Sequence, residues 1–210
     1  MKTDYREATA LDVDPIAALH GDSWRRNYRG AYPDAFLDSD VFADRLAIWT
    51  DRLARPASRR NQYTIVAECD GVLAGFAHTI LDDDPTWGAL LDNLHVRHDL
   101  KGRRVGTRLM TETAQIVIER TPLSGLYLWV LESNTAAQAF YEARGGRCVG
   151  RESSEPPGGG TAVTGLRYVW PDPSVLLEPL PMNTGRAQVN AGAKGPIRRG
   201  SPPARQEASR

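Results

Sequence analysis

Residues 94–107 carry the clearest chemical signal in this chain. An apolar run ends at Val96, a short basic loop containing Gly102 follows, and a helical pattern begins at Gly106. The first N–H groups of a helix have no acceptor inside the helix, so they can bind a phosphate group. Glycine lets the backbone approach a ligand closely. Nearby positive charges come from Lys101, Arg103, Arg104 and Arg108. The segment therefore predicts an anion site for a phosphate-bearing cofactor.

The elements that must position this loop alternate between helix and strand patterns. Apolar spacing predicts helices over 12–27, 40–54, 106–120 and 134–144. Strands are expected over 5–9, 63–69, 72–81, 90–96, 126–131, 147–152 and 162–170. Asp70-Gly71 is typical of a tight hairpin turn. A hairpin meander followed by a crossover helix predicts the α/β (α+β) class, with a mixed, mostly antiparallel sheet and helices on both faces.

Composition limits the function classes. The 210 residues include 26 Lys and Arg and 26 Asp and Glu, so no net field favours nucleic acid or a membrane surface. No run of about 18 apolar residues suggests a membrane span, and the N-terminus lacks a signal-peptide pattern. We therefore expect a cytoplasmic protein that binds neither nucleic acid nor membranes.

Composition also changes near residue 171. Residues 1–173 are expected to form one domain, and residues 174–210 a Pro/Gly/Arg-rich, disordered tail. The two cysteines, Cys69 and Cys148, are too few for a disulfide framework and are expected to be small buried hydrophobes. No Cys/His cluster has zinc spacing, so no metal is predicted.

Three segments together resemble the Gcn5-related N-acetyltransferase (GNAT) superfamily. In residues 101–106, Lys101 stands where the family has Gln or Arg, Arg104 replaces the first glycine, and Gly106 matches the second. Residues 128–145 closely resemble the family's strand, Asn, helix, Phe-Tyr and Gly signature, although Gly146 stands where an aromatic usually follows. Residues 23–37 are similar to a Trp-Arg, Tyr-x-Gly and Pro stretch of bacterial members.

This resemblance implies an enzyme that binds acetyl-CoA and passes the acetyl group to an amine. The pyrophosphate is expected on the N–H groups of residues 103–107. We expect that the backbone at Arg104 does not require a positive φ angle. The guanidinium of Arg104 can bind a phosphate bidentately. The resemblance also implies that the strand before the loop pairs with the pantetheine arm and polarises the thioester carbonyl. The implied cofactor-binding residues are Leu94, His95, Val96, Lys101, Gly102, Arg103, Arg104, Val105, Gly106, Thr107, Asn134, Ala137 and Tyr141.

The resemblance also implies a general acid, Tyr141, which would protonate the leaving thiolate. A phenol is protonated at neutral pH and can donate to sulfur in a dry site. A packing role for Tyr141 is the alternative. Asn134 is expected to cap the helix that begins after it and to contact the cofactor.

Asp92 is the expected general base, because it falls on the strand position where similar enzymes often carry His or Glu. Strand alternation places Leu90, Asp92, Leu94 and Val96 on one face, with Asn93 and His95 on the other. This alternation predicts that the His95 side chain points away from the reacting groups. A structural role for Asp92 stays open, as do His78 and Glu132 as bases, or water alone.

The sequence does not identify the acceptor of the acetyl group. It is expected to be a primary amine of a small molecule or of a protein. Trp24, Tyr28, Tyr32 and Phe36 either line its pocket or form an aromatic core. The acidic loop 82–84 is either an attractor of cationic amines or a solvated loop. A non-catalytic acyl-CoA sensor or interaction module is the alternative function, and a generic nucleotide-binding protein a third. A homodimer is expected by analogy only.

Overall fold

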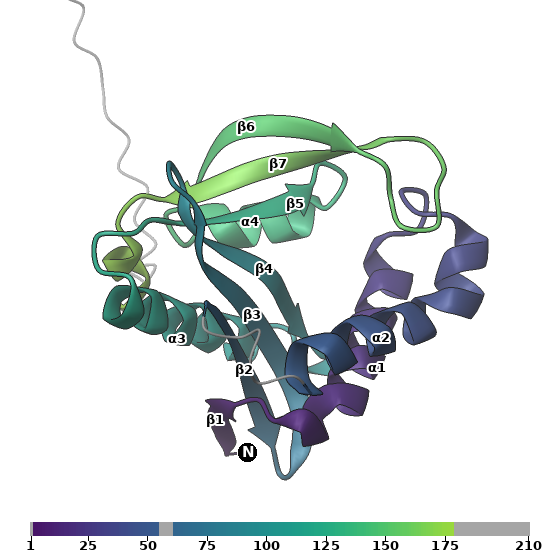
Figure 1. Ribbon diagram of the computed structural model, residues 1–210, viewed down its shortest axis with the longest axis horizontal. Helices are drawn as coiled ribbons and strands as arrows, with labels where there is room; N and C mark the ends of the chain where they lie inside the picture. Colours follow the sequence, from purple (N-terminus) through teal and green to yellow (C-terminus); the bar gives the residue numbers. More distant parts are fainter. Residues whose placement is uncertain (1, 55–60, 179–210) are drawn as a thin grey trace, which may run out of the picture. The chain divides into compact units, whose positions relative to one another are not determined.

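The computed structural model describes residues 2–54 and 61–178. Helices α1 (Val13–Asn27), α2 (Val41–Ala54), α3 (Val105–Arg120) and α4 (Thr135–Glu142) surround a sheet (Figure 1). The strands are β1 (Thr3–Glu7), β2 (Gln62–Cys69), β3 (Val72–Asp84), β4 (Gly88–Val96), β5 (Leu126–Leu131), β6 (Arg147–Ser154) and β7 (Val163–Trp170). Short helical turns lie at Ala10–Asp12, Phe36–Asp40, His98–Leu100 and Pro173–Leu176.

The strands lie in the order β1-β2-β3-β4-β5-β7-β6. Only β4 and β5 are parallel among these pairs, so the expected mixed, mostly antiparallel sheet is confirmed. The β2–β3 turn has positive φ angles at Asp70 and Gly71, 51° and 79°, as a tight hairpin requires.

The first strand lies two residues earlier than predicted. Thr9 ends the extended segment because its hydroxyl accepts from the Leu11 N–H, while its own N–H donates to Asp12 at 2.7 Å. This reciprocal capping box starts a helical turn at Ala10, which the alternating pattern did not reveal.

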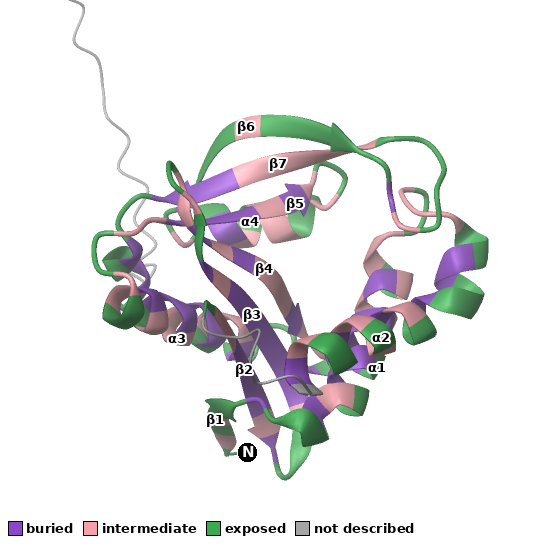
Figure 2. Cartoon of the chain, in the orientation of Figure 1, coloured by how far each residue is buried: buried purple, intermediate pink, exposed green. Residues whose placement is uncertain are grey.

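The two faces of the sheet bury separate apolar clusters, as the period-2 pattern of β2 requires. Ile65 and Ala67 pack with Leu109 and Met110 of α3, and Val66 packs on the opposite side. That opposite cluster includes Ile16 of α1 and Trp49 of α2 among its buried members. Figure 2 shows the central parts of β2 and β3 buried between these layers, whereas β4 is mostly of intermediate burial and β6 is almost wholly exposed. Helices therefore cover both faces, as predicted.

The packed region continues past residue 173. Leu176, in the turn Pro173–Leu176, is buried, and its carbonyl accepts from the Thr111 hydroxyl of α3 at 3.0 Å. Residues 179–210, which include most of the predicted tail, lie outside the described residues.

Two further sequence features can be compared with the structure. Cys69 is buried as expected, but Cys148 is exposed, because it lies on the open edge strand β6. Across the described ranges, we find no helix with the length and apolar character needed to span a bilayer.

Candidate active site

Strands β4 and β5 separate after a short parallel contact. They pair only at Ala89 with Leu126 and at Leu90 with Tyr127, while β4 stays paired with β3 as far as Val96. Along an antiparallel strand, successive N–H groups point to opposite edges. The N–H of Arg97 donates to Ala74 at 2.9 Å on the β3 side. The N–H groups of Val96 and Leu94 therefore point toward the gap that β5 leaves.

The basic loop connects β4 to α3. Gly102 has a φ angle of 77°, and Arg104, the residue before the helix, has a φ angle of 65°. The expectation that Arg104 needs no positive φ angle is therefore wrong. This left-handed conformation costs a non-glycine residue about 1–2 kcal/mol, so it explains why glycine is the family's residue here. It lets the chain turn sharply into the helix.

The start of α3 presents free backbone donors. The first bond within the helix runs from the Arg108 N–H to the Arg104 carbonyl at 3.0 Å. Helix geometry therefore leaves the N–H groups of Val105, Gly106 and Thr107 without an acceptor one turn back. A β-carbon at Gly106 would lie 3.5 Å from Val96 and 3.6 Å from Phe140, so this position tolerates a small side chain at most.

Positive charge gathers at the same place. Arg144, just beyond α4, donates to the Thr107 hydroxyl. Burial lowers the pKa of Arg144, and the positive charge of Arg104 lowers it further. Two neighbouring guanidinium groups beside free N–H donors are stabilised by an anion. The residues present therefore fit a diphosphate group.

A cavity of about 780 Å³ joins the β4–β5 gap to the C-terminal part of α1. This volume lies in the range of small-molecule and cofactor sites. Every residue predicted for the site lines it except Arg103. Those lining residues are Asp92, Leu94, His95, Val96, Lys101, Gly102, Arg104, Val105, Gly106, Thr107, Asn134, Ala137 and Tyr141.

Helix α4 holds Tyr141 against the cavity. Asn134 caps α4 by accepting from the Ala137 N–H at 3.2 Å, which confirms the expected cap. The Tyr141 ring is buried near the rings of Tyr168 and Trp170. Its hydroxyl makes no hydrogen bond to any other described residue, and burial raises its pKa. Tyr141 is therefore protonated at neutral pH and has a proton to donate into the cavity.

Gly146, where the signature usually has an aromatic, lies under Trp170 of β7. A β-carbon there would come within 2.6 Å of the Trp170 ring and 2.9 Å of the Tyr141 carbonyl. Trp170 also donates from Nε1 to the Arg144 carbonyl at 2.9 Å. The aromatic group that closes this end of α4 thus comes from another strand.

A β-bulge in β4 overturns the predicted strand parity. Asn93 lies opposite His78 and Leu91 lies opposite Thr79, so Asp92 is an extra residue without a partner on β3. Leu91 therefore packs on the α3 face together with Leu94, and Leu90 and Asp92 do not share that face as predicted. A bulge re-aims side chains without any hydrophobic signature, so simple alternation misses it.

The bulge directs Asp92 and Asn93 toward α2. Arg52 of α2 bonds to both: its Nη2 lies 2.7 Å from Oδ2 of Asp92, and its Nη1 donates to Oδ1 of Asn93 at 2.9 Å. Arg52, Asp92 and Asn93 all line the cavity. Asp92 therefore stands beside a cation in the cavity wall, not within the apolar face.

His95 also lines the cavity, contrary to its predicted direction. Its Nδ1 lies 2.8 Å from the Ser23 hydroxyl of α1, and its ring is 4.5 Å from that of His20. Burial lowers the pKa of His95 to about 3, with further lowering from Arg45 and Lys101. His95 is therefore neutral and weakly basic at neutral pH.

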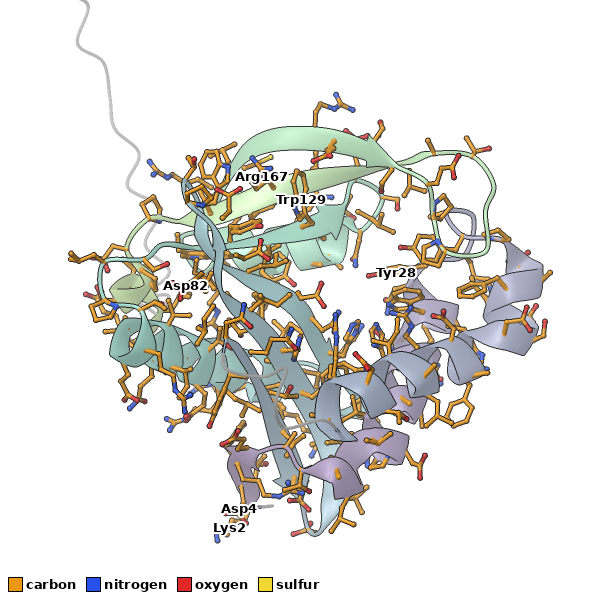
Figure 3. All side chains as sticks on the ribbon, viewed as in Figure 1. Lys2, Asp4, Tyr28, Asp82, Trp129 and Arg167 are labelled. Atoms are coloured by element: carbon orange, nitrogen blue, oxygen red, sulfur yellow. The ribbon has the colours of Figure 1, made fainter. Side chains whose placement is uncertain are left out.

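The aromatic residues of the first helical region fill both expected roles. All four belong to or pack against one apolar cluster, and Trp24, Tyr28 and Tyr32 also line the cavity, whereas Phe36 does not. Tyr28 extends from the end of α1 with its hydroxyl directed toward the sheet (Figure 3). Burial raises the pKa of Tyr28, and Tyr32 and Tyr141 raise it further. Tyr28 therefore shares the cavity with Tyr141.

The remaining polar candidates lie outside the cavity lining. His78 is buried with Nδ1 2.7 Å from the Thr64 hydroxyl, and Glu132 is paired with Arg151 at 2.9 Å. Residues 82–84 form the end of β3 and not a loop as expected. There Asp83 accepts from the Tyr127 hydroxyl of β5, and Asp84 accepts from the N–H groups of Thr86 and Trp87. Asp83 and Asp84 therefore stabilise the β3–β4 hairpin and its contact with β5.

Two lining arginines on α2 were missed in the sequence. Arg45 and Arg52 flank Trp49 at helical spacing, and both guanidinium groups lie over tryptophan rings. Their signal is an arginine on the apolar stripe of a helix, which needs a partner when it is buried.

Comparisons with known proteins agree with this geometry. The acetyltransferase (GNAT) family profile matches residues 21–146. The chain is 27% identical over 174 residues to the uncharacterized N-acetyltransferase YuaI of Bacillus subtilis, covering 81% of this chain and 94% of that protein. It is 24% identical to a probable N-acetyltransferase of Mycobacterium tuberculosis, covering 78% and 90%.

A solved structure shares the fold. The PaiA N-acetyltransferase of Thermoplasma acidophilum, crystallised with coenzyme A, aligns with a TM-score of 0.62 at 18% identity, covering 81% of this chain and all of that one. The family profile spans more than half of the present sequence and includes the loop, α3 and α4. This chain belongs to the acetyltransferase (GNAT) family.

Proposed function

We propose that this protein transfers the acetyl group of acetyl-CoA to a primary amine by direct attack. The observation that carries the proposal is the continuity of one cavity from the free N–H groups of α3, past Tyr141, to Asp92 and Tyr28. A cofactor end and an acceptor end thus meet at a proton donor and a carboxylate.

The cofactor end suits coenzyme A. The N–H groups of residues 105–107 with Arg104 and Arg144 would hold the pyrophosphate. The open edge of β4 would pair with the amides of the pantetheine arm, as an added strand does. An N–H of Val96 or Leu94 would then donate to the thioester carbonyl oxygen and stabilise the charge that develops there.

The chemistry is a simple substitution. The neutral amine attacks the carbonyl carbon, a C–N bond forms, and the C–S bond breaks. The leaving thiolate takes the proton of the Tyr141 hydroxyl. The nitrogen, positively charged once the C–N bond has formed, gives one proton to Asp92, directly or through water, and Arg52 fixes the position of that carboxylate. The Tyr141 phenolate then regains a proton from solvent.

His95 is not the base that we propose for this step. Its low pKa leaves the imidazole neutral but with little affinity for a proton at neutral pH. We assign it instead, with Ser23, to the wall of the cavity.

A thiol-release assay over a panel of primary amines with acetyl-CoA tests the proposal. We expect amine-dependent release of free coenzyme A together with acetylated amine detected by mass spectrometry. Binding of acetyl-CoA without release for any amine would support a non-catalytic acyl-CoA-binding module instead.

A further inference from the structure

We propose that the acceptor amine also carries a carboxylate, and that Arg45 binds it. This inference rests on the proposed function, since it names the substrate class of the same cavity. It starts from a cation in the wall of the acceptor end that the mechanism does not use.

Arg45 reaches the cavity from α2. Its guanidinium lies 4.1 Å from the centre of the Trp24 ring, and the residue is only 7% exposed. Its bonds to Asp44 use Nε, at 2.8 Å, and Nη2. Among the described residues, Nη1 has no hydrogen-bond acceptor. The outer edge of the guanidinium thus keeps donors for a planar anion.

Arg45 is the lining arginine of α2 whose carboxylate partner, Asp44, lies outside the cavity lining. Asp92 is the one carboxylate among the lining residues of the described chain, and Arg52 already pairs with it at 2.7 Å. Asp44 is absent from the lining, and its side chain is 36% exposed. His95 is neutral, and the positive charge of Arg45 is the first of two that lower its pKa. A carboxylate would accept from the guanidinium donors that Asp44 does not use, whereas an ammonium group of a polyamine offers them no acceptor.

The surrounding groups are suited to the rest of such an acceptor. The Trp24 ring lies 5.1 Å from that of Tyr32 and 5.4 Å from that of Tyr28, measured between centres. These rings give the apolar part of an amino acid a surface beside the cation. The amine nitrogen would then extend toward Asp92 and the thioester.

Matched pairs of acceptors test the proposal. Tyrosine with tyramine, phenylalanine with phenethylamine, and methionine with 3-(methylthio)propylamine differ only in the carboxylate. We expect kcat/KM with acetyl-CoA to be about 10-fold or more higher for at least one acid than for its amine partner, because a charge-assisted bond discriminates by about that factor.

Substitutions at Arg45 test its role separately from the roles of the other cavity residues. Arg45→Met keeps much of the volume and should lower kcat/KM for the acid about 10-fold or more while leaving its amine partner within about threefold. Arg45→Lys should restore part of the loss. Arg26→Met, which removes an exposed α1 arginine paired with Asp22, is the control and should change neither.

A binding measurement tests the role of Arg45 independently of turnover. Calorimetry of the coenzyme A complex with the same pairs should give tighter binding of the acid in the unaltered protein and no preference in Arg45→Met. Amine members that bind and react as well as the acids, or acids that do not bind the complex, overturn the inference. Transfer to the amines alone would leave the proposed function standing.

Discussion

Arg52 and Asp92 form an ion pair inside the cavity, with Nη2 2.7 Å from Oδ2. The side chains are 23% and 30% exposed, so the pair is partly shielded from water. It connects helix α2 to the bulge of β4 and fixes the direction of the proposed base.

Asp92→Asn is expected to lower kcat about 100-fold, because it removes the group proposed to take the amine proton. The dissociation constant of acetyl-CoA should change little. Arg52→Met should lower kcat less, because the carboxylate remains but loses the group that fixes its position. Stopped-flow thiol release measures both effects. Asp99→Asn, which breaks the exposed pair with Arg97, is the control. A fully active Asp92→Asn enzyme would exclude the base role.

Tyr141→Phe is expected to lower kcat by about 100-fold, since the thiolate would leave without a proton donor. Acetyl-CoA affinity should stay within about threefold. Tyr168→Phe is a matched control, because Tyr168 packs beside Tyr141 but donates its hydroxyl to Glu142 at 2.7 Å. Steady-state kinetics with one acceptor compare the two. Equal losses in both variants would assign Tyr141 to packing.

Arg104 holds a left-handed conformation, which gives a stability prediction. Arg104→Gly removes both the strain and the charge, whereas Arg104→Ala removes only the charge. The free energy of unfolding should be about 1 kcal/mol higher for Arg104→Gly than for Arg104→Ala. Urea denaturation measures the difference. Equal stabilities would mean that the loop relaxes in solution.

Both Arg104 variants should bind coenzyme A more weakly than the unaltered protein, because each lacks the guanidinium proposed to contact the pyrophosphate. Calorimetry at low salt reports this loss. Unchanged affinity in both would remove Arg104 from the cofactor site.

His95 makes stability depend on pH. Its pKa is about 3 in the folded protein and near 6.5 when unfolded, so below pH 6.5 the unfolded state binds the extra proton. Stability is thus retained above pH 6.5 and lost as pH falls toward 3. Between pH 7 and pH 5 the loss from this group is about 2 kcal/mol.

His95→Gln should reduce the pH 7 to pH 5 difference in unfolding free energy by about that amount. Urea titrations at the two pH values measure it. His98→Gln, at an exposed histidine, is the control and should leave the difference unchanged. The same difference in His95→Gln as in the unaltered protein would contradict the buried, neutral imidazole.

Much of the fold was predictable because its signals are local. Asp70-Gly71 marks the hairpin, Asn134 marks the start of α4, and β5 lies where its apolar run predicts it. The lining of the cavity by Tyr141 and the residues of the α3 loop also follows from their positions on these elements.

The predictions that were wrong have a different origin. The bulge at Asp92 and the exposed Cys148 depend on pairing with distant residues or on the absence of a neighbouring strand. The left-handed backbone of Arg104 has no signal in the residue type, because arginine does not favour a positive φ angle as glycine does. Likewise, Trp170 reaches Gly146 only because β7 folds back beside β5. Local patterns carry no information about such contacts.

Hydrogen exchange with and without acetyl-CoA tests the central claim most directly, because it locates the cofactor. At saturation, we expect slower exchange in backbone amides of residues 94–96 and 105–107, and no change in β6. Saturable binding without protection in these segments would contradict this account. So would the absence of binding to folded protein at millimolar acetyl-CoA.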